Sequence, residues 1–200
     1  MKTIALLLLA LTAPLVFAQD ITLPAPQTDG GKPLMQALAA RKSARQFADR
    51  ALAPQTLSNL LWAAYGFNRP DKRTAPSARN KQEMEVYVFL KDGVYLYDAK
   101  ANKLLQKAAG DHRATAGTQA FVATAPVNLV LVADLSALDR ELLHADCGFI
   151  SQNVYLFCAS EGLATVVRAG VDKPALAKLL GLRDQQEALY NQCIGYPPAP

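Results

Sequence analysis

The chain has 200 residues, of which 51% are apolar and 19% are charged. This composition allows a sizeable hydrophobic core and excludes a disordered tail. The formal net charge is only +4, whereas nucleic-acid-binding proteins carry denser basic residues grouped on one face, so we expect no nucleic-acid partner.

The first residues are typical of a secretory signal peptide. Met1-Lys2 is a short basic start, residues 4–16 are almost wholly apolar, and Val16-Phe17-Ala18 places small residues where a signal peptidase reads. We therefore expect residues 1–18 to be removed and the protein to be exported, periplasmic or secreted, with no membrane contact after cleavage. An uncleaved anchor is the alternative.

The next part of the chain predicts an extended lead-in followed by helices. Residues 19–33 are rich in proline and glycine and predict the lead-in. Pro33 then opens a short helix, because proline is favoured in the first helical turn. Leucines at helical spacing predict a second helix from Pro54 to Tyr65. Residues 67–81 lack periodicity and predict a polar loop, which at this length is usually functional or disordered.

The rest of the chain predicts interleaved strands and helices. The apolar run of residues 127–135 predicts a central strand that is buried on both faces. The other expected elements are a hairpin of residues 85–90 and 94–98, a short helix at 104–109, a long helix at 140–161, a strand at 163–167, a helix at 173–180 and a short last strand at 190–196. This order predicts an α+β fold, an α/β sandwich.

The three cysteines predict buried free thiols. Cys147 and Cys158 are about 16 Å apart along the predicted long helix, which is too far for a disulfide. Cys193 could pair with either, but nothing in the sequence requires it.

Three polar segments beside predicted core elements carry the chemistry of a binding site. The first, Arg41-Lys42-Ser43-Ala44-Arg45, has three cations and a hydroxyl, and guanidinium groups match phosphate oxygens two at a time. The second, residues 76–82, includes Asn80 and Gln82, whose amides suit a ring with donor and acceptor edges. The third, residues 167–170, ends in a glycine that permits close backbone approach. Alternatively, the cations of the first segment only stabilise a helix C-terminus.

Several other kinds of site are absent from the sequence. It contains no Gly-x-Gly-x-x-Gly motif, no Walker loop and no Gly-x-Ser-x-Gly elbow. The two histidines, His112 and His144, have no partner at metal-ligand spacing, so we expect no metal site. We expect Asp111-His112 to be a solvated loop pair, and Asp146 to be a structural hydrogen-bond acceptor.

The sequence resembles the nitroreductase family of flavin enzymes over residues 34–197, in particular a small branch similar to azoline (thiazoline/oxazoline) dehydrogenase domains. Five motifs occur in the family's order. They are Arg41–Phe47, similar to Arg-x-Ser-x-Arg/Lys-x-Phe; Ala75–Gln82, similar to Pro-Ser-x-x-Asn-x-Gln; Asp146-Cys147-Gly148 with Gln152-Asn153; Glu161–Thr165; and Ile194–Pro197.

This resemblance implies a domain over residues 34–200 with a central mixed sheet flanked by helices, a non-covalent FMN, and a homodimer with its two flavins in the subunit interface. It implies no catalytic side chain, because the redox chemistry belongs to the cofactor. The FMN-binding residues that it implies are Arg41, Lys42 and Ser43 at the phosphate and ribityl chain, Arg45 at the pyrimidine end, Asn80 and Gln82 at the ring edge, Pro76, Ser77 and Ala78 in the adjoining wall, Arg168 at the phosphate, and the backbone of Ala169 and Gly170 near the reactive nitrogen.

The expected function is that of an exported FMN-dependent oxidoreductase, which transfers two electrons by a ping-pong mechanism to a small organic acceptor. The alternatives are a non-catalytic flavin- or ligand-binding dimeric module and a dimeric relative without cofactor. Many relatives continue beyond the final Gly-x-Pro into basic residues, and many carry Glu where this chain has Ala169. Export also argues against NAD(P)H as the donor, because nicotinamide nucleotides are scarce outside the cytoplasm.

Overall fold

The computed structural model describes residues 19–199, so the predicted signal peptide of residues 1–18 lies outside the described part. The strands of its main sheet are β1 (Ile21–Thr22), β4 (Met84–Phe89), β5 (Gly93–Asp98), β6 (Lys103–Ala109), β7 (Val127–Asp134), β8 (Ala164–Arg168) and β9 (Gln186–Gly195). The α-helices are α1 (Leu34–Ala40), α2 (Pro54–Tyr65), α3 (Arg140–Glu161) and α4 (Lys173–Leu180). Smaller elements are strands β2 (Phe67–Arg69) and β3 (Lys72–Arg73) and the 3₁₀ turns η1 (Ala78–Asn80), η2 (Arg113–Ala116) and η3 (Ala120–Thr124).

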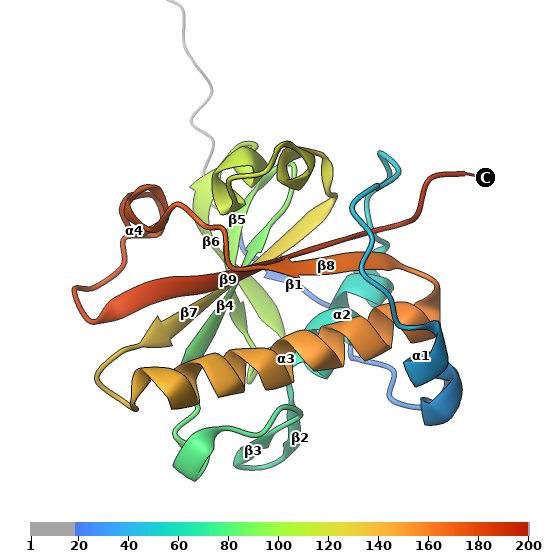
Figure 1. Ribbon diagram of the computed structural model, residues 1–200, viewed down its shortest axis with the longest axis horizontal. Helices are drawn as coiled ribbons and strands as arrows, with labels where there is room; N and C mark the ends of the chain where they lie inside the picture. Colours follow the sequence, from blue (N-terminus) through green and yellow to red (C-terminus); the bar gives the residue numbers. More distant parts are fainter. Residues whose placement is uncertain (1–18, 200) are drawn as a thin grey trace, which may run out of the picture.

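The main sheet runs in the order β1-β6-β5-β4-β7-β9-β8, with helices packed against both faces (Figure 1). This arrangement confirms the predicted α+β sandwich. The expectation of a mixed sheet is wrong, because every neighbouring pair of strands is antiparallel. The central position of β7 explains the apolar run that predicted it, since Val127–Ala133 is buried throughout.

Two hydrophobic layers enclose the sheet. On one face, α2 and α3 pack on the sheet through side chains such as Leu60 and Ile150, both almost fully buried. On the other face, α4 and the η2–η3 segment pack on it through Leu176 and Val122.

The helix boundaries follow from local signals in the sequence. The carboxylate of Asp172 accepts a hydrogen bond from the Ala175 backbone N–H at 3.1 Å and caps α4. Gly162 ends α3 with a φ of 70°, a left-handed conformation that favours glycine. All three cysteines are buried free thiols, which confirms that prediction.

Two predictions of local structure are wrong. The expected helix at 104–109 is strand β6, which pairs with β5 along its length. Lys, Leu, Gln and Ala favour helix, but the turn before Lys103 brings this run back beside β5, and the pairing overrides the propensity. The last strand is also longer than expected, because β9 begins at Gln186 and pairs with both β7 and β8.

The lead-in of residues 19–33 is extended, as predicted, but it is attached to the domain. Strand β1 pairs with β6, and the Asn102 side chain donates to the Pro24 carbonyl at 2.8 Å. Leu23 is buried in the core beside α2. Within residues 19–199, no helix is both long and apolar enough to cross a membrane.

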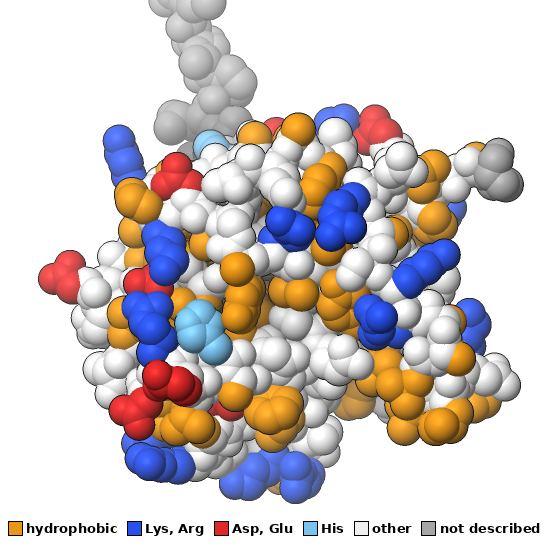
Figure 2. Space-filling model, in the orientation of Figure 1, with side chains coloured by type: hydrophobic (Ala, Val, Ile, Leu, Met, Phe, Trp, Pro, Cys, Tyr) orange, Lys and Arg blue, Asp and Glu red, His pale blue; other side chains and the backbone are white. Residues whose placement is uncertain are grey.

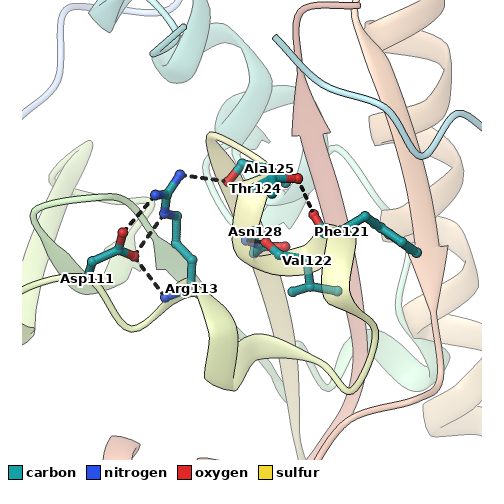
Figure 3. A network of polar contacts seen from close by, with 7 residues as sticks. All are labelled: Asp111, Arg113, Phe121, Val122, Thr124, Ala125 and Asn128. Carbon is teal, nitrogen blue, oxygen red and sulfur yellow. Dashed lines mark hydrogen bonds and ion pairs between the residues drawn. The ribbon is translucent and has the colours of Figure 1, made fainter. Parts of the chain in front are cut away.

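A polar network fixes the connection between β6 and β7 (Figure 3). The Arg113 guanidinium donates to both carboxylate oxygens of Asp111, at 2.8 and 2.7 Å, and to the Ala125 carbonyl at 3.2 Å. These contacts hold the pKa of Asp111 below its ordinary value, mainly through the Arg113 hydrogen bond. His112 instead contacts the Ala109 carbonyl. The Asp111 carboxylate is therefore engaged with Arg113 rather than with His112.

Candidate functional site

The basic segment of residues 41–47 lies beside β8, the edge strand of the sheet. The Ala44 backbone N–H donates to the Thr165 carbonyl at 2.9 Å, and the Ala48 N–H donates to the Tyr196 carbonyl at 2.9 Å. The segment is extended because it follows the sheet edge after α1 has ended at Arg41. This position brings the first and third predicted segments next to each other.

Tyr155 of α3 joins these two segments. Its hydroxyl lies 2.8 Å from the Ser43 hydroxyl and 3.1 Å from the Val167 backbone N–H, which donates to it. The guanidinium carbon of Arg41 lies 5.3 Å from the centroid of the Tyr155 ring, within the range of a cation–π contact. Tyr155 itself is only 8% exposed, so its side chain is a fixed support beneath the exposed basic segment.

A cavity of about 620 Å³ opens beside Tyr155, and this volume is typical of small-molecule sites. Lys42, Arg45 and Tyr155 are among the residues that line it. None of Arg41, Lys42 or Arg45 pairs with a carboxylate among residues 19–199. Their charges are therefore available to an anionic ligand.

Arg168 ends β8 at the same edge of the molecule. Its Nε atom is buried and has no hydrogen-bond partner among the described residues. Burial raises the pKa of the Cys193 thiol to about 12, although the charge of Arg168 opposes that shift. Buried polar atoms are rarely left unpaired, so this nitrogen indicates a place for a ligand acceptor.

Ala169 and Gly170 follow Arg168 and are exposed. The Gly170 carbonyl accepts a hydrogen bond from the Thr118 backbone N–H at 3.1 Å. A Cβ atom at Gly170 would lie 3.0 Å from the Thr118 hydroxyl, which is tighter than most such contacts. The close backbone approach predicted for Gly170 is therefore made, in this chain, to the η2–η3 connection.

The second predicted segment, residues 76–82, forms a strained turn around η1. Arg79, Asn80 and Gln82 have φ angles of 53°, 55° and 51°. Left-handed backbone is costly for residues other than glycine and is concentrated at functional sites. The strain is held by the Ala78 N–H, which donates to Asp146 Oδ2 at 2.8 Å. The prediction that Asp146 is a structural acceptor is confirmed.

The Gln82 side chain is already engaged within this turn. Its Nε2 donates to the Asp71 carbonyl at 2.7 Å and to Asn80 Oδ1 at 3.2 Å, while its Oε1 accepts from Arg73 Nε at 3.0 Å. Its backbone N–H donates to the Ser77 hydroxyl at 3.0 Å. In this structure, Gln82 therefore shapes the turn, and Asn80 remains exposed at its surface.

Within one chain, the structure does not bring residues 76–82 to the cavity. The turn is attached to α3 at Asp146, whereas the basic segment is attached at Tyr155. Nine residues of helix amount to about two and a half turns and about 13 Å, so these anchors lie on opposite sides of α3. Figure 1 shows the same division, with the β2–β3 region below α3 and the segment after α1 above it.

A buried acidic cluster lies behind the strained turn. Glu83 is 9% exposed, Asp146 is 2% exposed, and neither Glu83 oxygen has a partner among residues 19–199. Burial, reinforced by the neighbouring Asp146, raises the pKa of Glu83 to about 7. Burial also raises the pKa of the nearby Tyr65 hydroxyl.

Sequence reasoning missed Tyr155 and Glu83. Tyr155 lies on the buried side of a predicted long helix, where an aromatic residue is expected to pack in the hydrophobic core. Glu83 directly precedes a strand, where an acidic residue usually faces solvent. Neither position carries a local signal in the sequence. Tyr155 acts through Ser43, and the pKa of Glu83 depends on Asp146, and both partners are at least 63 residues away in the chain.

Comparison with known proteins identifies the family to which the chain is similar. Residues 38–196 match the nitroreductase family. A crystal structure of a nitroreductase from Ralstonia eutropha is 39% identical, with a TM-score of 0.84 and coverage of 90% of each chain. A protein of Methanocaldococcus jannaschii named as a nitroreductase is 33% identical over 153 residues, which are 66% of this chain and 76% of that protein.

A more distant structure, a chain of the Escherichia coli microcin synthetase complex, shares the fold. It is 21% identical, with a TM-score of 0.66, and the match covers 77% of this chain and 68% of that one. The resemblance drawn from the five sequence motifs is confirmed by these matches. The chain belongs to the nitroreductase family of oxidoreductases.

Proposed function

We propose that the protein is an FMN-dependent oxidoreductase and that each of its two cofactor sites is formed by two copies of the chain. The observation that carries the proposal is the arrangement at Tyr155. The unpaired cations Lys42 and Arg45 line the same cavity as Tyr155, and the Ser43 hydroxyl and the Arg41 guanidinium contact the Tyr155 side chain. Anionic phosphate is the group that such a cluster of cations and hydroxyl donors suits.

The residues present fit this cofactor. Arg41, Lys42 and Ser43 would hold the phosphate and ribityl chain, and Arg45 would lie at the pyrimidine end. The buried, unpartnered Nε of Arg168 supplies one further donor at the same edge. FMN, when bound, supplies the two-electron redox chemistry, while the chain binds it, orients it and excludes water.

The turn of residues 76–82 would reach this cofactor from the second copy. Its two anchors on α3 are about 13 Å apart and on opposite sides of the helix. In a two-fold dimer with α3 packed antiparallel on α3, the Asp146 end of one copy lies beside the Tyr155 end of the other. Pro76, Ser77, Ala78 and Asn80 of each copy would then wall the partner's cofactor, with Gln82 holding their conformation.

The exposed face of α3 suits such a contact. Ala145, Gly148, Phe149 and Gln152 follow helical spacing and are exposed, and a Cβ at Gly148 would meet nothing within 4 Å. Small residues allow helices to approach closely, and Phe149, at 46% exposure, is a large apolar group for the surface of a monomer. Figure 2 shows further exposed hydrophobic side chains over α1, where Leu34 and Met35 are 63% and 75% exposed.

The proposed reaction is ping-pong transfer of two electrons to a small organic acceptor, after export of the protein. The apolar signal-like start of the chain supports export, and an extracytoplasmic site argues against NAD(P)H as the donor. Cell fractionation and N-terminal sequencing of the mature protein test this part. A mature chain that begins near Gln19 is expected, and a cytoplasmic chain that retains Met1 would contradict export.

A non-catalytic flavin-binding module is the competing function. Both proteins would bind FMN with a shift in its absorbance. Only the enzyme would be reduced by dithionite and then reoxidised rapidly by a quinone or a nitroaromatic compound. Reoxidation no faster than that of free FMN would favour the binding module.

FMN titration of the purified protein tests the proposed site. Wild type should quench FMN fluorescence with saturation at one FMN per chain. The double substitution Arg41→Ala and Arg45→Ala should weaken binding at least 100-fold, because each lost charged hydrogen bond costs about 1.5–3 kcal/mol. Lys103→Ala with Lys107→Ala removes the same charge from exposed positions on β6 and should leave affinity unchanged. Equal effects of the two double variants would contradict the placement of the site.

A further inference from the structure

We propose that Tyr155 is a positioning residue, which fixes the direction of the Ser43 hydroxyl proton toward the phosphate of the cofactor. This inference rests on the proposed function, because it names how one part of that site is prepared for its ligand. It concerns a residue that the sequence motifs do not contain.

The directions of the Tyr155 and Ser43 hydroxyl protons follow from which neighbouring groups can donate and which can accept a hydrogen bond. The Val167 backbone N–H can only donate, so the Tyr155 oxygen accepts at 3.1 Å. A phenol carries one proton, and the Ser43 oxygen, at 2.8 Å, is the acceptor available to it among the described residues. Tyr155 therefore donates to Ser43, and the proton of Ser43 must point elsewhere.

The direction left to the Ser43 proton is the exposed side of the segment. Ser43 is exposed, whereas Tyr155 is 8% exposed and fixed within α3. A phosphate oxygen can only accept hydrogen bonds, so a hydroxyl that presents its proton outward is prepared for it. A freely rotating serine would have to be oriented on binding, at an entropic cost.

The same tyrosine also holds a neighbouring charge. The Arg41 guanidinium lies over its ring, two residues before Ser43. Tyr155 thus links α3, β8 and the basic segment. Its hydroxyl is hydrogen-bonded to Ser43, and its ring makes a cation–π contact with Arg41. Phenylalanine would retain the ring contact and remove only the hydroxyl, which makes the two effects separable.

A double-mutant cycle of Tyr155→Phe and Ser43→Ala tests the inference through FMN affinity. Each single variant should weaken binding about 10-fold, the range of one hydrogen bond to a charged group. The double variant should bind no more weakly than Ser43→Ala, because Tyr155 acts through Ser43. Two effects that multiply, or no effect of Tyr155→Phe, would overturn the inference.

Three further measurements make the result specific. Riboflavin lacks the phosphate, so Tyr155→Phe should change its affinity less than that of FMN; equal losses would overturn the assignment to the phosphate. Tyr190→Phe removes a hydroxyl that lies 3.1 Å from His144 Nδ1 and should leave FMN affinity unchanged. Circular dichroism at the titration temperature should show all four variants folded.

The proposed function and this inference fail in different ways. If wild type binds FMN and the cycle is additive, only the role of Tyr155 is overturned. If wild type binds no FMN, the proposed function fails, and the cycle is then read with inorganic phosphate, by NMR shifts of the Ser43 and Val167 amides. Phosphate-dependent shifts that Tyr155→Phe reduces would support the inference, and absence of any shift would overturn it.

Discussion

Replacement of Glu83 by glutamine should stabilise the protein at pH 8 and change its stability little at pH 5. Glu83 is 9% exposed and directly precedes β4, where it faces the buried carboxyl of Asp146. The other titratable groups around this pair are Tyr65 and Cys147, and Arg73 lies against the Tyr65 ring. Glutamine has the shape of the protonated acid but carries no charge to desolvate.

The magnitude follows from the shift of the pKa. Burial raises the pKa of Glu83 from 4.5 to about 7. Between these values the folded state binds more protons than the unfolded state, so stability is greatest below pH 4.5 and falls as the pH rises toward 7. Each pKa unit corresponds to about 1.4 kcal/mol, which gives a loss on the order of 3 kcal/mol by pH 8.

Urea unfolding of both proteins at pH 5 and pH 8 measures this loss. Wild type should lose between about 1 and 3 kcal/mol of unfolding free energy over this interval, and Glu83→Gln should lose much less. Glu161→Gln, at an exposed position at the end of α3, should retain the wild-type pH dependence. If Glu83→Gln depends on pH as wild type does, Glu83 is not the group that titrates, and the reasoning is refuted.

Two further predictions concern an ion-pair cluster and the proposed dimer contact. Hydrogen bonds from Arg140 and Lys173 lower the pKa of Glu187 to about 2, so its stabilisation is complete above pH 4.5 and is lost as the pH falls through 2. Glu187→Gln should therefore cost about 1 kcal/mol at pH 7 and much less at pH 2 by urea unfolding, and an equal cost at both would contradict the pairing. Phe149→Glu should give a folded monomer by light scattering that also loses FMN, whereas the exposed change Glu141→Gln should do neither; a Phe149→Glu dimer that retains FMN would exclude α3 from the interface.

The sequence was sufficient for elements whose stability is local. Asp172 and Gly162 mark the ends of their helices because caps act within one turn. The run at 127–135 identified the central strand because β7 is buried on both faces. The prediction of a helix at 104–109 was wrong because the side chains of Lys103–Ala109 favour helix, and only the pairing with β5 makes this run a strand.

The site was predictable in its residue types and not in its assembly. The cations at 41–45 predict an anion site, with stabilisation of a helix C-terminus as the alternative. The proposed division of the site between two copies rests on the half-turn that separates Asp146 from Tyr155 around α3, which is visible only when both contacts are known. The buried proximity of Glu83 and Asp146 likewise brings together two residues that are distant in the chain.

Mixed dimers provide the most direct test of the central claim that two chains share each cofactor. One chain carries Arg41→Ala with Arg45→Ala, and a second chain, with a different affinity tag, carries Asn80→Ala with Ser77→Ala. Each homodimer should bind FMN poorly, because both of its sites are defective. A heterodimer purified through both tags should regain one FMN per dimer at wild-type affinity, because one of its sites is then wholly intact. Failure to regain any FMN in folded heterodimers would place both segments at the same site within one chain and contradict the account.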